Sequence, residues 1–509
     1  MKKIAYLGLS SFAATLVIGI NQAAGDAEPN GNALTIYSTA QPGAIAPEVY
    51  RNGVRGQAVP GYAVVRQQRD INFNRGRNTV RFSDVAALID PTTVIFESLT
   101  DPAGTSVLEQ NFQFDLVSQE KLLQKYIDQT VKVDQLRGNN VESFSGTLLS
   151  ASGGMILKRD DGSVQLLPSN AGVTLPSLPG GLITRPTLVW DIVAQRAGSQ
   201  RTRVSYQTTG VTWWTDYNLT YSEGSNANAC KLDVGAWVSV INQSGASYPE
   251  AKLKLIAGDV QRARPAGRAN VPQAALRAMV REEKDTGFAE KELFEYHLYT
   301  LGRPTTLPDN STKQIELFPA AHNVPCEKTL VYYGVAPSYH GYGASPVTDR
   351  NYGVQSNKKV DVYLGFRNSQ DHNMGMPLPS GRIRVSKIDS ADKTLEFIGE
   401  DVIDHTPKNE KVLIKLGSAF DVVGERRQVD FKVDTSRKTM SEDIEIKLRN
   451  QKKEAVTVIA KENLYRWINW QITSKTHDYE KQDARTIQFP LKIAAGGEVT
   501  LRYSVQYTW

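Results

Sequence analysis

The spacing of apolar and polar residues predicts a chain built mainly from β-strands. Apolar side chains alternate with polar ones in segments such as Asn78–Phe82, Thr93–Leu99 and Val107–Leu116. A period of two places successive side chains on opposite faces of a strand, so one face can be buried while the other meets water. The pattern recurs in Lys231–Ile241, Lys359–Phe366, Arg382–Lys387, Lys411–Leu416, Val429–Val433 and Ile444–Leu448. Many short strands of this kind predict antiparallel β-sandwiches, immunoglobulin-like in part, and small barrel modules.

Turn and helix signals agree with a fold that has few helices. The triplet Asp160-Asp161-Gly162 separates two apolar runs, and glycine supplies the positive φ that a hairpin turn needs. A short helix is predicted over 118–127, because Ser118 can accept a hydrogen bond from the first turn. A second helical stretch is predicted over 272–283, inside a polar insertion at 261–290 that we expect to be mobile.

Composition along the chain suggests five segments. A Pro- and Gly-rich stretch, Leu175–Thr187, marks the clearest boundary. The predicted segments are a signal peptide at 1–25, an N-terminal β domain at 33–128, a small β-barrel-like unit at 129–190, a linked β-sandwich core at 191–440 that contains the insertion, and a C-terminal immunoglobulin-like sandwich at 441–509.

Three of the alternating segments end in asparagine before a polar turn. They are Trp237–Asn242, Val362–Asn368 and Ile444–Asn450. Asparagine tolerates left-handed backbone and can hydrogen-bond the turn that follows it. The shared ending is a weak indication of repeated sandwich modules.

The first residues have the pattern of a secretory signal peptide. Lys2 and Lys3 precede the apolar stretch Ile4–Ile20, and the small residues Ala23 and Gly25 suit cleavage by signal peptidase after position 25. The alternative is an uncleaved anchor, although the apolar stretch is short for a membrane helix. We therefore expect export by the general secretory route to the periplasm, the cell surface or the medium.

Charge and hydropathy restrict the classes of partner that we expect for the mature chain. Removal of residues 1–25 takes away two of the 59 basic residues and none of the 54 acidic ones, which lowers the formal net charge from +5 to +3. Nucleic-acid binding is not expected from this near balance, since it requires a concentrated positive face. No later apolar run is long enough for a helix to cross a bilayer, so no transmembrane span is expected in the mature chain.

The chain has two cysteines, Cys230 and Cys326, each at the start of a strand-like run. An even pair in an oxidising compartment favours a disulfide, and closing a loop of this length contributes about 4 kcal/mol in the chain-entropy model. The alternative is two buried free thiols, because the sequence does not supply the Cα separation that a disulfide requires.

An ordered set of β segments extends through the second half of the chain. The segments are Val204–Tyr206, Gly210–Trp213, Asp216–Leu219, Trp237–Gly245, Tyr248, Ala251–Val260 and Glu295–Tyr299. In this order they resemble the bacterial family called domain of unknown function 4139 (DUF4139), over about residue 190 to the end. Some members of the wider group are labelled mucoidy inhibitors and carry a long coiled coil, for which this chain has no heptad run. The resemblance implies an exported β protein and no established activity.

Motifs of catalysis are missing from the sequence. It has no nucleophile elbow, P-loop, dinucleotide fingerprint, His-Glu-x-x-His helix or paired Cys-x-x-Cys, so neither a cofactor nor a metal is expected. Three of the six histidines adjoin aspartate, as Asp371-His372, Asp404-His405 and His477-Asp478. Adjacent residues on a strand point to opposite faces, so adjacency does not make a catalytic dyad.

Two other polar groupings have ordinary structural interpretations. Glu295, His297 and Tyr299 would share one face of a strand, which predicts a solvated or hydrogen-bonded sheet face more than a ligand site. Glu400, Asp401 and Asp404 form a tight acidic cluster. A glycosidase needs two carboxyl groups at a set separation across a cleft, and we interpret this cluster as a turn.

The segment Ala336–Gly353, the Tyr/Gly loop, is the most suggestive binding feature. It contains Tyr339, Tyr342 and Tyr352 among glycine, serine and asparagine residues. This composition is typical of recognition loops, where tyrosine rings supply contact area at small entropic cost. These three tyrosines are the candidate ligand-binding residues. The alternative is a flexible loop whose tyrosines pack on its own scaffold.

We therefore expect an exported cell-envelope protein that binds or scaffolds without catalysis, with envelope proteins or glycans as partners. The competing hypothesis is a hydrolase that acts on envelope polysaccharide or peptide polymers. It requires a deep pocket in which carboxylates or histidines converge. The alternating end Leu501–Trp509 also resembles the last strand of an outer-membrane barrel, but the strands before it are too uneven for one.

Overall fold

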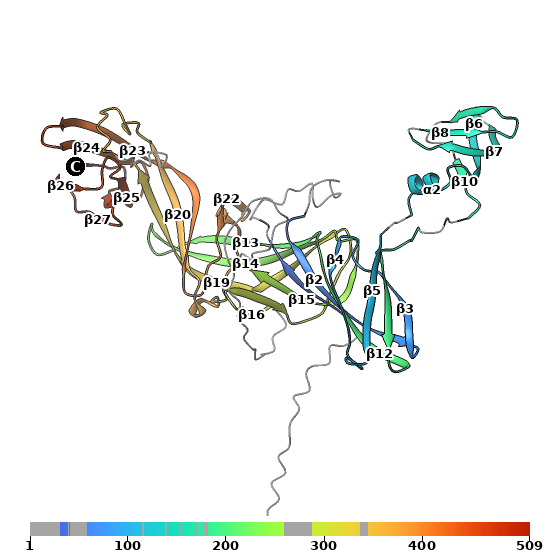
Figure 1. Ribbon diagram of the computed structural model, residues 1–509. Coiled ribbons are helices and arrows are strands. Elements are labelled where there is room, and N and C mark those ends of the chain that lie inside the picture. Colours follow the sequence, from blue (N-terminus) through green and yellow to red (C-terminus); the bar gives the residue numbers. More distant parts are fainter. Residues whose placement is uncertain are drawn as a thin grey trace, which may run out of the picture.

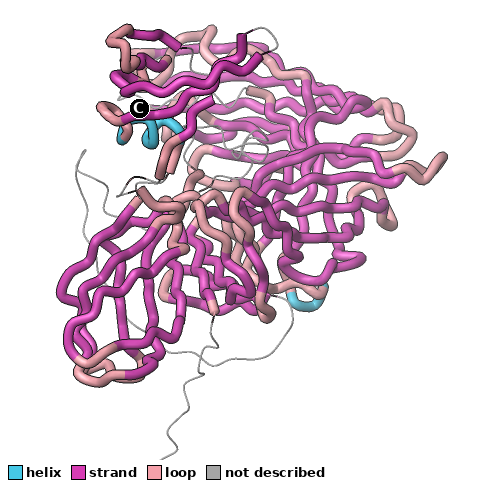
Figure 2. The backbone as a smooth tube through the Cα atoms, turned by 90° about the vertical axis from the view of Figure 1, so that its right-hand side faces the viewer, coloured by secondary structure: helices cyan, strands magenta, loops and turns pink. Residues whose placement is uncertain are grey.

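Strands make up most of the protein (Figure 2), which confirms the predicted mainly β fold. The computed structural model describes residues 31–38, 40, 59–114, 117–137, 140–152, 154–167, 172–177, 179, 182–258, 288–335 and 345–509. In these residues the helical elements are α2 (Gln119–Lys125) and the 3-10 turn η1 (Gln370–His372). The predicted signal peptide, most of the insertion and the helix predicted at 272–283 lie outside the described residues.

Two sheets pack together in the N-terminal part of the chain. Trp190 lies between Phe82 of its own sheet and Phe96 of the larger sheet, with ring centroids 5.3 and 5.2 Å away, so the two sheets share one core. The smaller sheet has the order β3 (Gly76–Ser83), β11 (Thr187–Ala194) and β5 (Thr105–Gln113). The larger sheet has the order β16 (Phe288–Leu293), β17 (Tyr296–Leu301), β15 (Tyr248–Ala257), β1 (Asn32–Tyr37), β2 (Tyr62–Phe73), β12 (Gly198–Thr208) and β4 (Ile89–Ser98), with β18 (Thr305–Leu307) beside β15.

A small unit is inserted between β5 and β11, which are neighbours in one sheet. Figure 1 shows this unit apart from the other sheets, joined to them by the chain on its two sides. It has its own apolar core, in which Leu123 and Tyr126 pack with Leu148. Its strands follow the order β10 (Gly172–Thr174), β6 (Thr130–Arg137), β7 (Asn140–Ser150), β8 (Met155–Lys158) and β9 (Val164–Leu167). The two outer strands, β10 and β9, do not pair with each other, so the sheet is open and the predicted small barrel is wrong.

Two local predictions are confirmed in this unit. The Ser118 hydroxyl accepts a hydrogen bond from the Lys121 amide at 3.3 Å, which caps α2 as expected for an N-terminal serine. The strands β8 and β9 pair as an antiparallel hairpin around Asp160–Gly162, where Gly162 has a φ of 86°. Both features depend on residues close together in sequence.

The remaining strands form one sheet of thirteen that curls through the central and C-terminal parts. Its continuity comes from two long strands, since β19 pairs first with β14 and then with β20 and β25, while β23 pairs first with β20 and then with β24 (Figure 1). The central and C-terminal parts of the sheet are therefore joined by continuous backbone hydrogen bonding. The strands are β13 (Val211–Glu223), β14 (Ala229–Asn242), β19 (Ser311–Tyr333), β20 (Lys359–Arg367), β21 (Gly381–Ile388), β22 (Leu395–Ile403), β23 (Lys411–Asp434), β24 (Thr439–Asn450), β25 (Val456–Asn463), β26 (Trp470–Lys475), β27 (Glu480–Lys481), β28 (Thr486–Ile493) and β29 (Glu498–Thr508).

Strand direction departs from the expected antiparallel pattern at three places. The pairs β1–β15, β13–β21 and β19–β25 are parallel, and each joins strands that are far apart in the sequence. Parallel neighbours need a long crossover, so short-range turn signals do not reveal them.

Cys230 and Cys326 form a disulfide, with an S–S distance of 2.04 Å and a Cα–Cα distance of 4.8 Å. The two residues are direct partners across β14 and β19, which places the bond between neighbouring strands of the central sheet. The alternative of two free thiols is therefore excluded.

The three asparagines predicted to end strands share one arrangement. Asn242, Asn368 and Asn450 are all fully buried, and none has a positive φ, so the left-handed backbone expected for them is wrong. Each carboxamide bonds the turn or loop that follows it, as predicted, and also the main chain of another nearby loop, which satisfies carbonyls that water does not reach. The accepting carbonyls are those of Ala246, Leu307 and Pro308 for Asn242, of Met376 and Pro407 for Asn368, and of Glu454 and Ala494 for Asn450.

Replacing Asn450 by alanine should lower the free energy of unfolding by about 2 kcal/mol, because two carbonyls and one amide lose a buried partner. Urea denaturation followed by tryptophan fluorescence measures this loss. Asn111→Ala, at an exposed position of β5, is the matched control and should stay within about 0.5 kcal/mol of the parent. Equal stability of the two variants would show that the carboxamide bonds are energetically neutral.

Candidate functional site

The Tyr/Gly loop connects β19 to β20, and the structure describes its last part, from residue 345 onward. Tyr339 and Tyr342 lie outside the described residues. Tyr352 is half-buried, and its ring lies 5.6 Å from that of Tyr465 at an angle of 51°. Tyr352 therefore packs on Tyr465, in the segment after β25, and belongs to the base of the loop.

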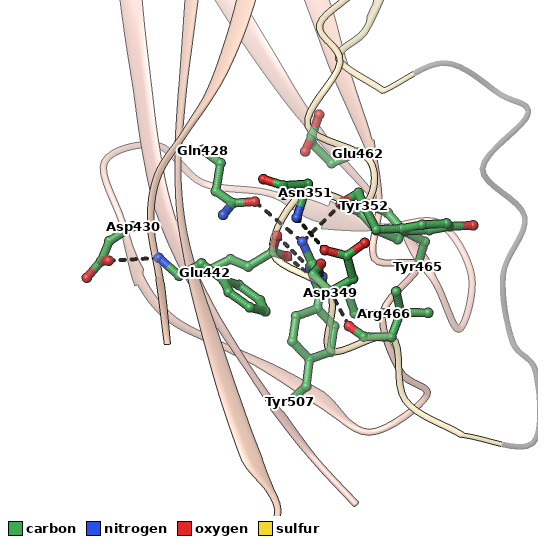
Figure 3. Close-up of polar contacts among 12 residues, drawn as sticks. Asp349, Asn351, Tyr352, Gln428, Asp430, Glu442, Glu462, Tyr465, Arg466 and Tyr507 are labelled. Atoms are coloured by element: carbon green, nitrogen blue, oxygen red, sulfur yellow. Dashed lines mark hydrogen bonds and ion pairs between the residues drawn. The ribbon is translucent and has the colours of Figure 1, made fainter. Parts of the chain in front are cut away.

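Arg466, in the segment after β25, binds the main chain of the loop (Figure 3). Its Nη1 donates to the carbonyls of Val347 at 3.0 Å and Asp349 at 2.7 Å, and its Nη2 donates to the carbonyl of Tyr352 at 3.2 Å. The Val347 amide donates in return to the Arg466 carbonyl at 3.0 Å. The arginine side chain is completely buried, so these bonds fix the base of the loop without competition from water.

Two further contacts close the base of the loop. The Tyr465 hydroxyl donates to the Tyr352 carbonyl at 2.9 Å. Gly353 follows with a φ of 73°, and a Cβ atom at this position would lie 2.4 Å from the Tyr465 hydroxyl oxygen. Glycine is required here both by the backbone conformation and by the close approach of that ring.

Beneath the loop lies a buried charge network of two arginines and two glutamates. The Arg466 Nε lies 2.7 Å from Glu442 Oε1, and the Arg426 Nε donates to Glu462 Oε2 at 2.9 Å. The hydroxyls of Tyr507 and Tyr503 donate to Glu442 and Glu462 respectively. All four charged side chains are at most 3% exposed, so each depends on its partner for the solvation it has lost.

Burial shapes the protonation of this network. It raises the pKa of Tyr507 and Tyr503 well above the usual range, and the neighbouring carboxylate raises each further, Glu442 for Tyr507 and Glu462 for Tyr503. Burial alone would lower the pKa of Arg426, but Glu462 raises it and the net shift is upward. The phenols therefore remain donors and the guanidinium remains charged at neutral pH.

Sequence reasoning missed this network, although three of its members carried a signal. Glu442 stands at an inward phase of β24 with Met440 and Ile444, where the alternation calls for an apolar residue. Glu462 occupies the corresponding phase of β25, and Arg426 does so in β23. A charged residue at a buried phase of a strand indicates a buried partner, because an unpaired charge there is too costly.

The other predicted polar groups are not assembled into a site. In the described part of the chain, the histidines of the three Asp-His neighbours bond serine, threonine or main-chain groups. His297 Nδ1 lies 2.6 Å from the carboxylate oxygen Oε1 of Glu290, which accepts its hydrogen bond. Tyr299 is buried and donates to the Pro377 carbonyl, so the predicted Glu-His-Tyr row is not one surface. Of the other histidines, His372 bonds Ser369, His405 accepts from the Ser380 amide and His477 bonds Thr476. His322 lies beside Asp233.

The interpretation of the acidic cluster as a turn is wrong for two of its members. Glu400 and Asp401 lie within β22. Asp401 accepts hydrogen bonds from the Lys415 amide of β23 at 2.7 Å and from the Val402 amide at 2.9 Å. The carboxylate therefore links two neighbouring strands that share no backbone ladder at this point.

A cavity of about 1080 Å³ lies beside β1 and β2. Its carboxylates already have partners: Asp84 pairs with Arg185 at 2.6 Å, Glu250 accepts from Thr306, and Asp309 accepts from the Gly245 amide. No group of three or more metal-binding side chains occurs in the described part of the chain. Each of these three carboxylates therefore has a structural partner at the wall of the cavity.

Neither a family model, nor a curated protein, nor a solved structure matches this chain. Within the described ranges, no helix has the length and apolar character needed to cross a membrane. The fold and the site define the class of protein. It is a mainly β chain of several sheets with a disulfide between β14 and β19, and a buried arginine in it binds the base of the Tyr/Gly loop.

Proposed function

We propose that this is an exported, non-enzymatic binding or scaffolding protein of the cell envelope, and that the Tyr/Gly loop is its contact surface. The observation that carries the proposal is the use of a buried arginine, Arg466, to hold three main-chain carbonyls at the base of that loop. A surface loop rarely needs a buried ion pair merely to connect two strands, because water can satisfy its carbonyls.

An anchored base suits recognition for a thermodynamic reason. Binding is weakened by the entropy lost when a loop becomes ordered, so a loop whose base is already fixed loses less on binding. The tyrosine and glycine content of the loop adds contact area at low side-chain entropy. Both features favour display of the loop to a partner.

Location in the envelope rests on separate observations. The start of the chain has the pattern of a signal peptide, and the Cys230–Cys326 disulfide fits an oxidising compartment. The resemblance to the DUF4139 family agrees with an exported β protein and adds no activity.

A site-specific crosslinking experiment tests the contact surface. A photo-reactive amino acid at position 342 of the full chain, irradiated in intact cells, should give discrete adducts, whereas the same amino acid at exposed position 453 should not. With the identified partner in hand, Tyr339→Ala combined with Tyr342→Ala should weaken its affinity at least about tenfold. Tyr479→Ala, at a half-buried position in the C-terminal part of the chain, is the control and should leave the affinity unchanged.

Two results would overturn the proposal. One is equal labelling from positions 342 and 453. The other is a partner whose affinity is the same for the doubly substituted protein and the parent, with both proteins folded by circular dichroism.

A further inference from the structure

A second cavity, the junction cavity, lies where the two large apolar cores meet. It has a volume of about 340 Å³. Ile398 and Leu416 on its wall pack against the core of the N-terminal and central sheets, while Val362 packs against the apolar core of the C-terminal part of the chain. It is independent of the Tyr/Gly loop, since it is lined by none of the loop's residues.

Three lysines enter the junction cavity from three separate segments. Lys328 comes from β19, Lys387 from β21 and Lys452 from the turn between β24 and β25. Two acids, Glu223 and Glu454, also line it, which leaves an excess of one positive charge. Such an excess beside apolar walls is the pattern of a site for an anion.

The three amino groups differ in how they are satisfied. Lys387 Nζ lies 2.6 Å from Glu223 Oε1. Within the described part of the chain, the amino groups of Lys328 and Lys452 have neither a hydrogen bond nor an ion pair. Burial, followed by the charge of Lys452, lowers the pKa of the half-buried Lys328. Glu454 and Glu223 act in the opposite direction on Lys328 but form no direct ion pair with it.

The backbone holds both lysines in place. The Lys328 amide donates to the Asn228 carbonyl at 2.6 Å. The Lys452 amide donates to Asn450 Oδ1 at 3.0 Å, and the Lys452 carbonyl accepts from the Gly496 amide at 3.1 Å. A ligand would therefore meet cations whose main-chain positions are already set, which limits the entropy lost on binding.

We infer that the junction cavity binds a small organic anion, either a carboxylate or a phosphate monoester. Its charged group lies between Lys328 and Lys452, with Lys387 beside it. Its apolar part lies against Val362, Ile398 and Leu416. Lysine suits both head groups, because it acts as a point charge with three donors and does not demand planar geometry.

Calorimetry on the full-length mature protein, at fixed ionic strength, tests this site. The probes are phenyl phosphate and benzoate, with benzyl alcohol as the uncharged match and inorganic phosphate as the head group alone. Phenyl phosphate or benzoate should bind, and whichever of them binds identifies the head group. Benzyl alcohol should not bind, and inorganic phosphate should bind at least about tenfold more weakly than phenyl phosphate if the apolar wall contributes.

Matched lysine variants locate the binding. Lys328→Met keeps the apolar stem and should weaken the affinity at least about tenfold, and Lys452→Met should do the same. Lys359→Met, at an exposed position of β20, should bind as the parent does. The inference is overturned if neither organic anion binds the parent, or if both cavity variants, folded by circular dichroism, bind as well as Lys359→Met.

Discussion

Replacing Arg466 by methionine should lower the free energy of unfolding by about 3–5 kcal/mol, the range found when one partner of a buried ion pair is removed. Methionine keeps an unbranched apolar stem, and the guanidinium it replaces lies 4.3 Å from the centroid of Phe431. The loss would come from Glu442, left buried and charged without its arginine, and from the loop carbonyls that lose a donor.

Guanidinium denaturation followed by tryptophan fluorescence measures this effect. Arg437→Met is the matched control, because Arg437 is 84% exposed and its ion pair with Asp434 is on the surface. It should change the free energy of unfolding by less than about 0.5 kcal/mol. Combining Arg466→Met with Glu442→Met should be less damaging than Arg466→Met alone, since no unpaired charge is then buried. If the single and the combined variants are equally stable, the ion pair is not the source of the loss.

Removing the disulfide should have an effect of similar size. In Cys230→Ala combined with Cys326→Ala, the free energy of unfolding should fall by about 4 kcal/mol, because the bond closes a loop between residues 96 apart in sequence. The alanines avoid burying new polar groups at the position of Cys230, which is 4% exposed.

Denaturation with and without dithiothreitol checks this prediction. Reductant should lower the stability of the parent, at equilibrium, to about that of the double-alanine variant, and should leave the variant itself unchanged. A parent whose midpoint is the same in oxidised and fully reduced form would contradict a stabilising role for this bond. The comparison also separates the disulfide from the buried charges, because Arg466→Met should retain its response to reductant.

The predicted parts of the fold are those whose signals lie within a few residues. Alternation over a strand records which face is buried, and this allowed β14, β20 and β24 to be anticipated from Lys231–Ile241, Lys359–Phe366 and Ile444–Leu448. Ser118 and Gly162 carry equally local information, since a cap and a hairpin turn each involve neighbours in sequence.

The candidate site was predicted only in part. The tyrosine and glycine content drew attention to the segment 336–353, but composition could not identify what holds it in place. Arg466 follows the loop by more than a hundred positions, and nothing in its neighbourhood marks it as a ligand of the loop's carbonyls. The three lysines of the junction cavity are likewise ordinary surface residues when each is considered alone.

The sequence by itself determined the strand content, the short helix and the hairpin. The tertiary structure decided which strands are neighbours, that β19 and β23 serve two parts of the molecule, and that Cys230 lies directly opposite Cys326. It also decided which charges meet, as in the pair of Arg466 with Glu442 and the grouping of Lys328 with Lys452. The physical reason is that periodicity is a property of adjacent residues, whereas burial brings distant side chains together only after the long-range strand pairs have formed.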